Sequence, residues 1–187
     1  MPDETIQDEQ ILLWMKDERK AEQGFRLLMQ KYQERLYWHI RRMVVEHEDA
    51  NDVLQNCLIK VFRNIRQFEG KSQLYTWLYR IATNESISFL AQKKRQQTAS
   101  LDNSENHLSN KLHAEAHLDG TKIQAHLQSA LELLPQKQRL VFQLRYFEEM
   151  NYNDMSEVLG TSVGALKASF HHAVKKVESY LSGIQID

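Results

Sequence analysis

The sequence predicts an all-α protein built from two small helical domains joined by a flexible linker. Pro occurs only twice and Gly six times in 187 residues, so the turn signals that strands require are scarce. Apolar residues recur at spacings of three and four over long stretches, which is the period of an amphipathic helix. A polar segment without that period separates two such stretches. We therefore expect domains at 1–95 and 122–187, with the linker at 96–121.

The first apolar stretch, residues 10–45, carries one helical face that includes Leu28, Tyr32 and Leu36. Gly24 follows two polar residues, and this pattern predicts a break into two helices near 22–24. Core packing is the expected role of the face.

A second helix is predicted to begin at Glu48 and Asp49, because carboxylates are favourable at the positive end of a helix dipole. Its apolar stripe runs from Val53 to Ile65 and includes Phe62. The lone cysteine, Cys57, lies in this stripe, where a small core residue is expected. One cysteine cannot form an internal disulfide, which suits a reducing cytoplasm.

A loop around Gly70 then precedes a third helix, predicted over 74–94. Trp77 lies on its inner stripe, and we expect it to be shared between core and surface. Four residues lie off the centre of the stripe and are the better candidates for contact with a ligand. They are Tyr75, Tyr79, Arg80 and Asn84. In the loop, Phe68 could either cap the core or be exposed to take a base.

Positive charge is concentrated around this third helix. Eight Lys and Arg residues face two acids between Ile59 and Arg95, although the whole chain has a net charge of −1. Aromatic rings beside cations are typical of single-strand nucleic-acid binding, since bases stack on rings while cations follow the phosphates. The near-neutral total argues against binding DNA by electrostatics alone and favours a focused site with protein partners.

The segment 96–121 is rich in Gln, Ser, Asn and His and has little apolar surface to repay ordering, so we expect a flexible linker. His107, His113 and His117 match no strong metal-site spacing and are interpreted as solvated side chains.

The second apolar stretch ends in a predicted helix-turn-helix. A short helix from Tyr152 is followed by Gly160 at the turn and by a longer helix with Thr161 or Ser162 as its N-cap. The second helix would enter the major groove of duplex DNA.

Several functions are not expected. The sequence has no Gly-rich phosphate loop, nucleophile constellation or convincing metal set, so neither an enzyme nor a bound cofactor or metal is predicted. The acidic N-terminus does not resemble a secretion leader, and no apolar run is long enough to span a bilayer. We therefore expect a cytoplasmic protein without membrane insertion.

Three segments together resemble the extracytoplasmic-function (ECF) sigma factors of bacterial RNA polymerase. EDANDVLQNCLIKVFRNI and FEGKSQLYTWLYRIATN are similar to the promoter-melting domain of that family. LPQKQRLVFQLRYFEEMNYNDMSEVLGTSVGALK is similar to its terminal helix-turn-helix domain. The resemblance covers residues 10–181. It implies a transcription initiation factor that brings core polymerase to specific promoters and captures the melted minus-ten strand.

The resemblance also implies contacts for individual residues. Binding to the clamp coiled coil of the largest polymerase subunit would use Asp52, Gln55, Asn56, Lys60 and Arg63. Binding to the melted minus-ten strand would use Phe68, Ser72, Tyr75, Trp77, Arg80, Asn84, Ser88, Lys93, Lys94 and Arg95. Binding to the minus-thirty-five duplex would use Arg145, Thr161, Ser162, Lys167, Ala168, His171 and His172. The polymerase flap is a further expected partner, and the sequence leaves open whether an anti-sigma factor also binds.

The chain departs from the family pattern at four positions, Ser88, Ala165, Ser169 and His172, and three of them lower the charge or polarity of the duplex-reading helix. Because imidazoles change charge between about pH 5 and 8, promoter binding through His171 and His172 would be pH-sensitive. Two alternatives remain open at this point. One is a sigma-like mimic that occupies an anti-sigma factor, and the other is a stand-alone helix-turn-helix regulator.

Overall fold

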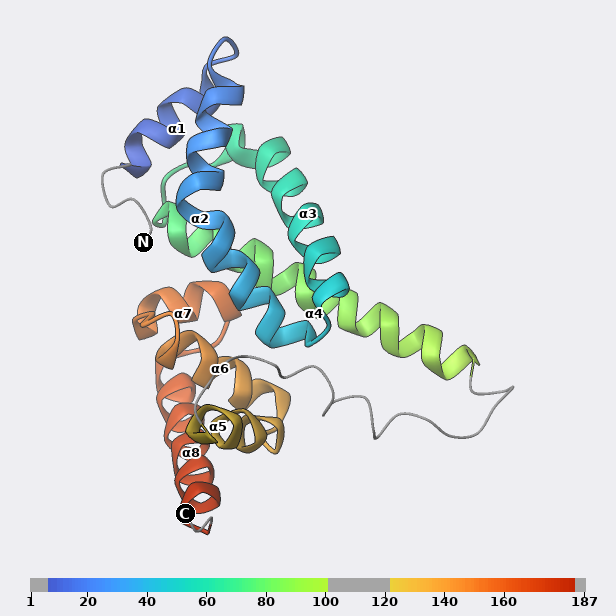
Figure 1. The fold of residues 1–187 in the computed structure, drawn as a ribbon. Helices are drawn as coiled ribbons and strands as arrows, with labels where there is room; N and C mark the ends of the chain where they lie inside the picture. The colour runs from blue at the N-terminus through green and yellow to red at the C-terminus, as the bar shows by residue number, and fades with distance from the viewer. Residues whose placement is uncertain (1–6, 101–121, 184–187) are drawn as a thin grey trace. The chain divides into compact units, whose positions relative to one another are not determined.

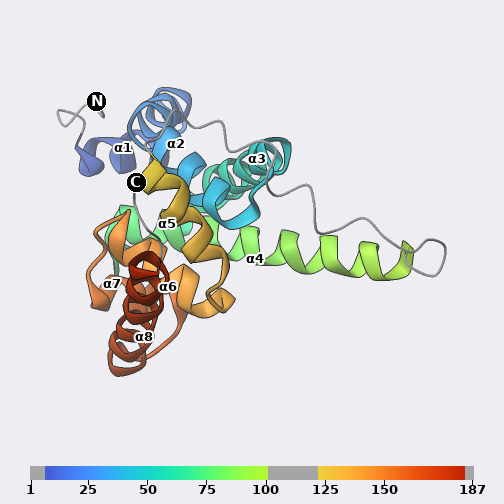
Figure 2. The same ribbon diagram turned by 60° about the horizontal axis from the view of Figure 1, so that its bottom comes forward.

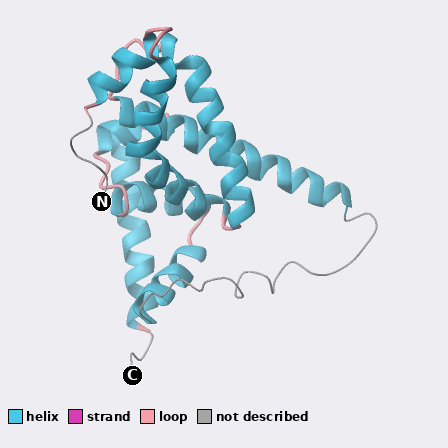
Figure 3. Cartoon of the chain, turned by 45° about the horizontal axis from the view of Figure 1, so that its top comes forward, coloured by secondary structure: helices cyan, strands magenta, loops and turns pink. Residues whose placement is uncertain are grey.

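The computed structural model describes residues 7–100 and 122–183, and every regular element in these ranges is helical. Figure 1 shows the helices in chain order, and Figure 3 shows that the described segments between them are loops and turns. The all-α prediction is confirmed for these residues. None of the described helices combines the length and apolar character needed to cross a membrane.

The described chain divides into two compact units, one centred on α1 to α4 and the other on α5 to α8. The first contains α1 (Asp8–Lys16), α2 (Ala21–Val44), α3 (His47–Asn64), the 3-10 helix η1 (Ile65–Gln67) and α4 (Leu74–Ser100) as far as Lys93. The second contains α5 (Lys122–Glu132), α6 (Gln136–Tyr146), α7 (Tyr152–Leu159) as far as Ser156 and α8 (Val163–Ser182).

Gly24 does not break a helix as the sequence analysis predicts. The break lies earlier, between Lys16 and Ala21, and Gly24 is buried inside α2. A Cβ atom on Gly24 would lie 2.5 Å from the backbone nitrogen of Met15. The glycine is therefore required for the close approach of α1 and α2 rather than for a turn.

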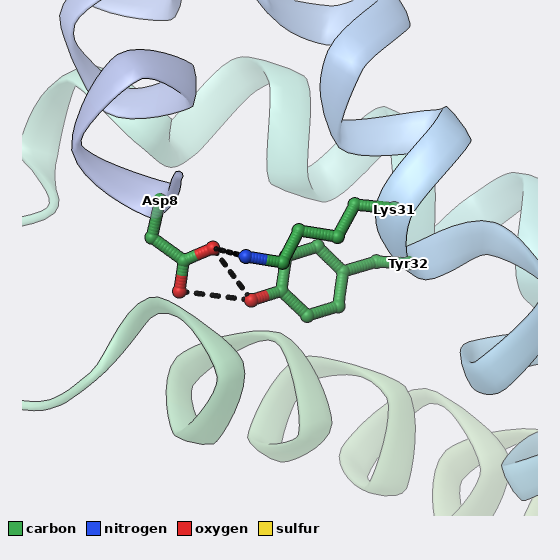
Figure 4. Close-up of polar contacts among 3 residues, drawn as sticks. All are labelled: Asp8, Lys31 and Tyr32. Atoms are coloured by element: carbon green, nitrogen blue, oxygen red, sulfur yellow. Dashed lines mark hydrogen bonds and ion pairs between the residues drawn. The ribbon is translucent and has the colours of Figure 1, made fainter. Parts of the chain in front are cut away.

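A polar contact fixes the beginning of α1 against α2 (Figure 4). The carboxylate of Asp8 accepts hydrogen bonds from the Tyr32 hydroxyl at 2.7 and 2.8 Å, and the Lys31 ammonium lies 2.7 Å from Oδ1. Burial, followed by the hydrogen bond to Asp8, raises the pKa of Tyr32 well above its usual value. The hydroxyl therefore stays protonated and keeps donating to Asp8.

Helix α3 begins at His47 with Glu48 and Asp49 in its first turn, as predicted. Cys57 is completely buried, and burial raises the pKa of its thiol to about 12. The core interpretation of this cysteine is thus confirmed. Phe62, in contrast, was assigned to the inner stripe but is 47% exposed and packs edge-on against Phe25. That assignment was wrong because the stripe is narrower than the sequence suggests.

Helix α4 begins at Leu74, as predicted, but continues to Ser100 rather than stopping at 94. The first five residues of the predicted linker are therefore helical, and the rest of the linker lies outside the described residues. Four consecutive residues, Thr76 to Tyr79, are buried. Because four residues exceed one helical turn, this part of α4 is enclosed on all sides.

In the second unit, α8 packs against both α5 and α6 (Figure 2). The core between these helices includes Leu131, Phe142 and Ala173. Pro135 occupies the N-cap position of α6 with a φ of −53°, so it neither ends α5 nor lies in the first turn of α6. Its fixed φ suits the entry into a helix.

Candidate nucleic-acid interface

The loop before α4 presents less aromatic surface than the sequence suggests. Phe68 is only 6% exposed and Trp77 only 9%, and their ring centroids lie 5.2 Å apart. The Lys16 ammonium donates to the Phe68 carbonyl at 2.8 Å and lies 5.9 Å from the centre of its ring. Of the two roles left open for Phe68, the structure favours the core cap, with Trp77 packed beside it. Ser72, in the same loop, is half-buried.

Tyr79 is completely buried, so its assignment to the exposed side of α4 was wrong. Its ring centroid lies 4.5 Å from that of Tyr75 and 4.9 Å from that of His39 in α2. His39 is itself buried, and its Nε2 is 2.9 Å from the hydroxyl of Thr83. Burial, with nearby Arg42 as the smaller cause, lowers the pKa of His39 to about 3. Behind half-buried Tyr75, the core therefore holds two buried rings in contact, Tyr79 and an uncharged His39.

A polar row follows on the surface of α4. Arg80, Asn84 and Ser88 are all exposed. Their spacing of four residues places them on one side of the helix, one turn after another. Guanidinium, amide and hydroxyl groups in such a row can donate to base edges and phosphates along a strand.

The basic triplet of α4, Lys93 to Arg95, is only partly available. The Lys93 ammonium lies 2.5 Å from a carboxylate oxygen of Asp49 in the first turn of α3, and its side chain is half-buried. Lys94 and Arg95 are exposed. A phosphate would therefore have to displace Asp49 from Lys93 but could reach the two following cations directly.

The predicted polymerase-binding residues share one exposed face of α3. They are Asp52, Gln55, Asn56, Lys60 and Arg63. Lys60 pairs with Glu85 of α4 at 2.5 Å, so this face is tied to the helix that carries the polar row. Ile59, absent from the prediction, lies within the same face and is 41% exposed. An apolar side chain among polar ones is typical of a protein interface.

The predicted helix-turn-helix is formed by α7 and α8. Gly160 follows α7 with a φ of +61°, and the Ser162 hydroxyl caps α8 by accepting from the backbone nitrogen of Ala165. Thr161 is half-buried beside the cap. The side chains predicted to face duplex DNA are all exposed on α8. They are Lys167, Ala168, His171 and His172.

Tyr152 lies between two cations at the start of α7. The Arg145 guanidinium lies 5.4 Å and the Lys167 ammonium 5.7 Å from the centre of its ring. Arg145 also donates to the carbonyl of Met150 at 3.2 Å, next to Glu149, whose φ is positive at 53°. Arg145 thus has a structural role in the α6–α7 turn that its position in the sequence does not indicate.

No group of three or more potential metal ligands occurs among the described residues. His107, His113 and His117 lie outside the described residues.

Two family models match the chain. Sigma-70 region 2 matches residues 28–96, and Sigma-70, region 4 matches residues 125–177. The first match contains α3 and most of α4, and the second contains α6 and α7 with most of α8.

Several bacterial proteins are similar over most of their length. RNA polymerase sigma-H factor of Pseudomonas aeruginosa is 29% identical over an alignment of 183 residues that covers 94% of this chain and 94% of its own. ECF RNA polymerase sigma-E factor of Haemophilus influenzae is 29% identical over 83% of this chain and 86% of its own. ECF RNA polymerase sigma factor SigW of Bacillus subtilis is 26% identical over 89% of this chain and 94% of its own.

Two solved structures share the fold. The sigma factor RpoE, in a co-crystal structure with the anti-sigma factor NepR from Bartonella quintana, has a TM-score of 0.71 at 21% identity and covers 87% of this chain and 99% of its own. CnrH, in complex with the cytosolic domain of CnrY, has a TM-score of 0.69 at 19% identity and covers 95% of this chain and 99% of its own. Both family models, the relatives and the shared fold agree with the three sequence segments identified above. The chain belongs to the extracytoplasmic-function sigma factors of bacterial RNA polymerase.

Proposed function

We propose that this chain, as an alternative sigma factor, divides promoter recognition between its two predicted domains. The domain at 1–95 binds core RNA polymerase and the melted minus-ten strand. The domain at 122–187 binds the minus-thirty-five element as duplex. The single observation that carries the proposal is the row of exposed polar side chains on α4, at Arg80, Asn84 and Ser88, in a chain that also holds a helix-turn-helix.

The structure sharpens which residues are proposed to meet the strand. The polar row, half-buried Tyr75 and the exposed cations Lys94 and Arg95 are available for direct contact. Phe68 and Trp77 support the strand-binding loop from beneath, because both rings are nearly buried. Lys93 also contacts the strand, once its ion pair with Asp49 is replaced by an ion pair with a phosphate.

The duplex is proposed to meet the exposed side of α8. Lys167 and the two histidines face base edges, while Arg145 reaches phosphate from the last turn of α6. Ser162 caps the N-terminus of α8, which is the positive end of the helix dipole. This end favours a nearby phosphate.

The polymerase is proposed to bind the exposed face of α3, with Ile59 added to the predicted residues. The clamp coiled coil is the expected partner there, and the flap is the expected partner of the second domain. The polymerase supplies the catalysis, so the chain needs no cofactor, and it works where the polymerase is, in the cytoplasm. An anti-sigma factor is a further proposed partner, because RpoE and CnrH were each solved with another protein bound.

Energetics explain why the polymerase is needed. Opening a base-pair step costs about 1.4 kcal/mol, and stacking returns roughly 1 to 3 kcal/mol per captured base. The two quantities nearly balance. With a net charge of −1, the free chain lacks the phosphate attraction that would tip the balance, so it should bind promoters weakly without core polymerase.

Run-off transcription with purified core polymerase tests the proposal. The wild-type chain should direct initiation from promoters of its own genome, and Asn84→Ala and Arg80→Ala should reduce it severalfold without changing polymerase binding. Gln33→Ala, at an exposed position of α2, is the matched control and should transcribe normally. A wild-type chain that supports no initiation would contradict the proposal and favour the sigma mimic.

A further inference from the structure

Arg35 of α2 lies over an aromatic ring that belongs to the proposed strand-binding surface. Its guanidinium carbon is 5.3 Å from the centroid of Tyr75 in α4, and the Arg35 side chain is exposed. A guanidinium at this distance is attracted to the ring face. Two helices that are far apart in the sequence thus bring a cation and a half-buried ring together at the surface.

The charge of Arg35 is not neutralised by a carboxylate among the residues that the structure describes. Three lysines of the same unit differ in this respect, since Lys31 pairs with Asp8, Lys60 with Glu85 and Lys93 with Asp49. The Asp8 carboxylate also accepts from Tyr32, one turn before Arg35, and is therefore already engaged. An unpaired guanidinium beside an aromatic ring can bind a phosphate without first breaking an ion pair.

Tyr75 is held in place from inside the protein. Its ring packs on Tyr79, Tyr79 packs on His39, and His39 is hydrogen-bonded to Thr83. This buried stack leaves the ring little freedom to move away. A base that meets Tyr75 therefore arrives at a fixed position, and the phosphate of the same nucleotide comes within reach of a long side chain on the neighbouring helix.

We propose that Arg35 is a strand-contacting residue that neutralises one phosphate next to the nucleotide that meets Tyr75. The strand-binding surface then extends from α4 onto α2. This inference rests on the proposed function, because it assumes that the surface around Tyr75 receives the melted strand.

The test measures strand binding by holoenzyme reconstituted from the full chain and core polymerase. The probe is a fluorescein-labelled, mixed-sequence single-stranded oligodeoxynucleotide, and its affinity is measured by anisotropy over a range of KCl concentrations. Each phosphate contact on a single strand contributes about −0.7 to the slope of log K against log salt. Arg35→Ala and Arg35→Gln should both make the slope less negative by about 0.7, with binding about tenfold weaker at low salt.

Arg35→Lys should keep the wild-type slope, because it keeps the charge, while losing part of the affinity. Arg26→Ala is the matched control. Arg26 is an exposed arginine on α2 that lies nine residues, about two and a half turns, before Arg35 and therefore faces the opposite way. Its slope and affinity should equal those of the wild type. Thermal unfolding and core binding, measured on every variant, should also match the wild type.

Two results would overturn the inference in distinguishable ways. An unchanged slope in Arg35→Ala and Arg35→Gln, with normal wild-type binding, would show that Arg35 meets no phosphate while the proposed function stands. A wild-type holoenzyme that binds the strand no better than core polymerase alone would remove the proposed function and this inference together.

Discussion

The imidazole of His39 packs 4.9 Å from the ring of Tyr79, centroid to centroid, and joins α2 to α4 inside the first unit. Both side chains are fully buried, and the imidazole is hydrogen-bonded to Thr83 through Nε2. The contact bears on the proposed function because the Tyr79 ring in turn packs against Tyr75. A polar core residue thus lies directly behind the proposed strand-binding surface.

His39 should make the stability of the chain depend on pH. Burial lowers its pKa to about 3, from the usual value of 6.5. Because the unfolded chain takes up the proton first, the stabilisation is fully present above about pH 6.5 and is lost as the pH falls toward 3. Lowering the pH from 7 to 5 should cost about 2 kcal/mol through this residue.

Urea denaturation at pH 7 and pH 5 measures this loss. In His39→Gln the difference between the free energies of unfolding at pH 7 and pH 5 should be smaller by about 2 kcal/mol. His171→Gln, at an exposed histidine of α8, is the control and should retain the wild-type difference. An equal loss of stability in wild type and His39→Gln would show that His39 does not carry the pH dependence.

Gly24 and Gly164 should respond to alanine in opposite directions. The Cβ of Gly24→Ala would meet backbone atoms of Met15 at 2.5 Å and of Trp14 at 2.9 Å, which forces α1 away from α2. We expect a loss of about 3 kcal/mol. Nothing lies within 4 Å of a Cβ at Gly164 in the first turn of α8, so Gly164→Ala should be neutral or stabilise by up to about 1 kcal/mol.

Chemical denaturation of the two glycine variants at one pH gives both values. If Gly24→Ala had the same midpoint denaturant concentration as the wild type, α1 and α2 would not be as close at Gly24 as the structure has them.

Local signals in the sequence predicted the helix boundaries that depend on capping and turns. The start of α4 after the Gly70 loop and the Ser162 cap of α8 both follow from chemistry within a few residues. Gly24 was misinterpreted because a glycine at a helix crossing and a glycine at a helix break look alike in sequence. The two cases differ only in which atoms of the folded protein lie next to the glycine, and this depends on the tertiary structure.

The candidate site was predicted less completely, for a related reason. Helical periodicity identifies one buried face, whereas the middle of α4 is buried all round, so Tyr79 was assigned to the surface. Arg35 was missed because the local excess of cations in the sequence lies between 59 and 95, and Arg35 is outside it. Its position over Tyr75 depends on how α2 crosses α4.

The hydrogen bonds between Tyr32 and Asp8 should contribute measurably to stability, because Tyr32 is only 3% exposed. A double-mutant cycle of Asp8→Ala and Tyr32→Phe should give a coupling energy of about 1.5 kcal/mol, since the acceptor is charged. The ion pair of Arg26 with Glu22, whose side chains are 76% and 80% exposed, is the comparison. Its coupling should not exceed about 0.5 kcal/mol.

Denaturation of the four proteins in each cycle provides the two coupling energies. Equal values would mean that burial gives the Asp8 contact no advantage over a surface pair.

Trp77 should be needed for folding more than for direct contact with DNA. Its ring is packed against Phe68 and nearly buried, so Trp77→Ala should cost about 3 to 5 kcal/mol. Trp77→Phe keeps an aromatic ring in the same place and should recover more than half of that loss. Arg80→Ala, one turn later on the exposed side, should change stability by less than about 0.5 kcal/mol.

Measuring stability and transcription on the same preparations distinguishes the Trp77 variants from Arg80→Ala. We expect Trp77→Phe to transcribe in proportion to its folded fraction, because the proposed role of Trp77 is to hold the loop around Phe68. Arg80→Ala should be fully folded and still initiate poorly, because its guanidinium is proposed to meet the strand itself. A stable Trp77→Ala protein that fails in transcription would reverse this assignment and make the tryptophan a direct contact.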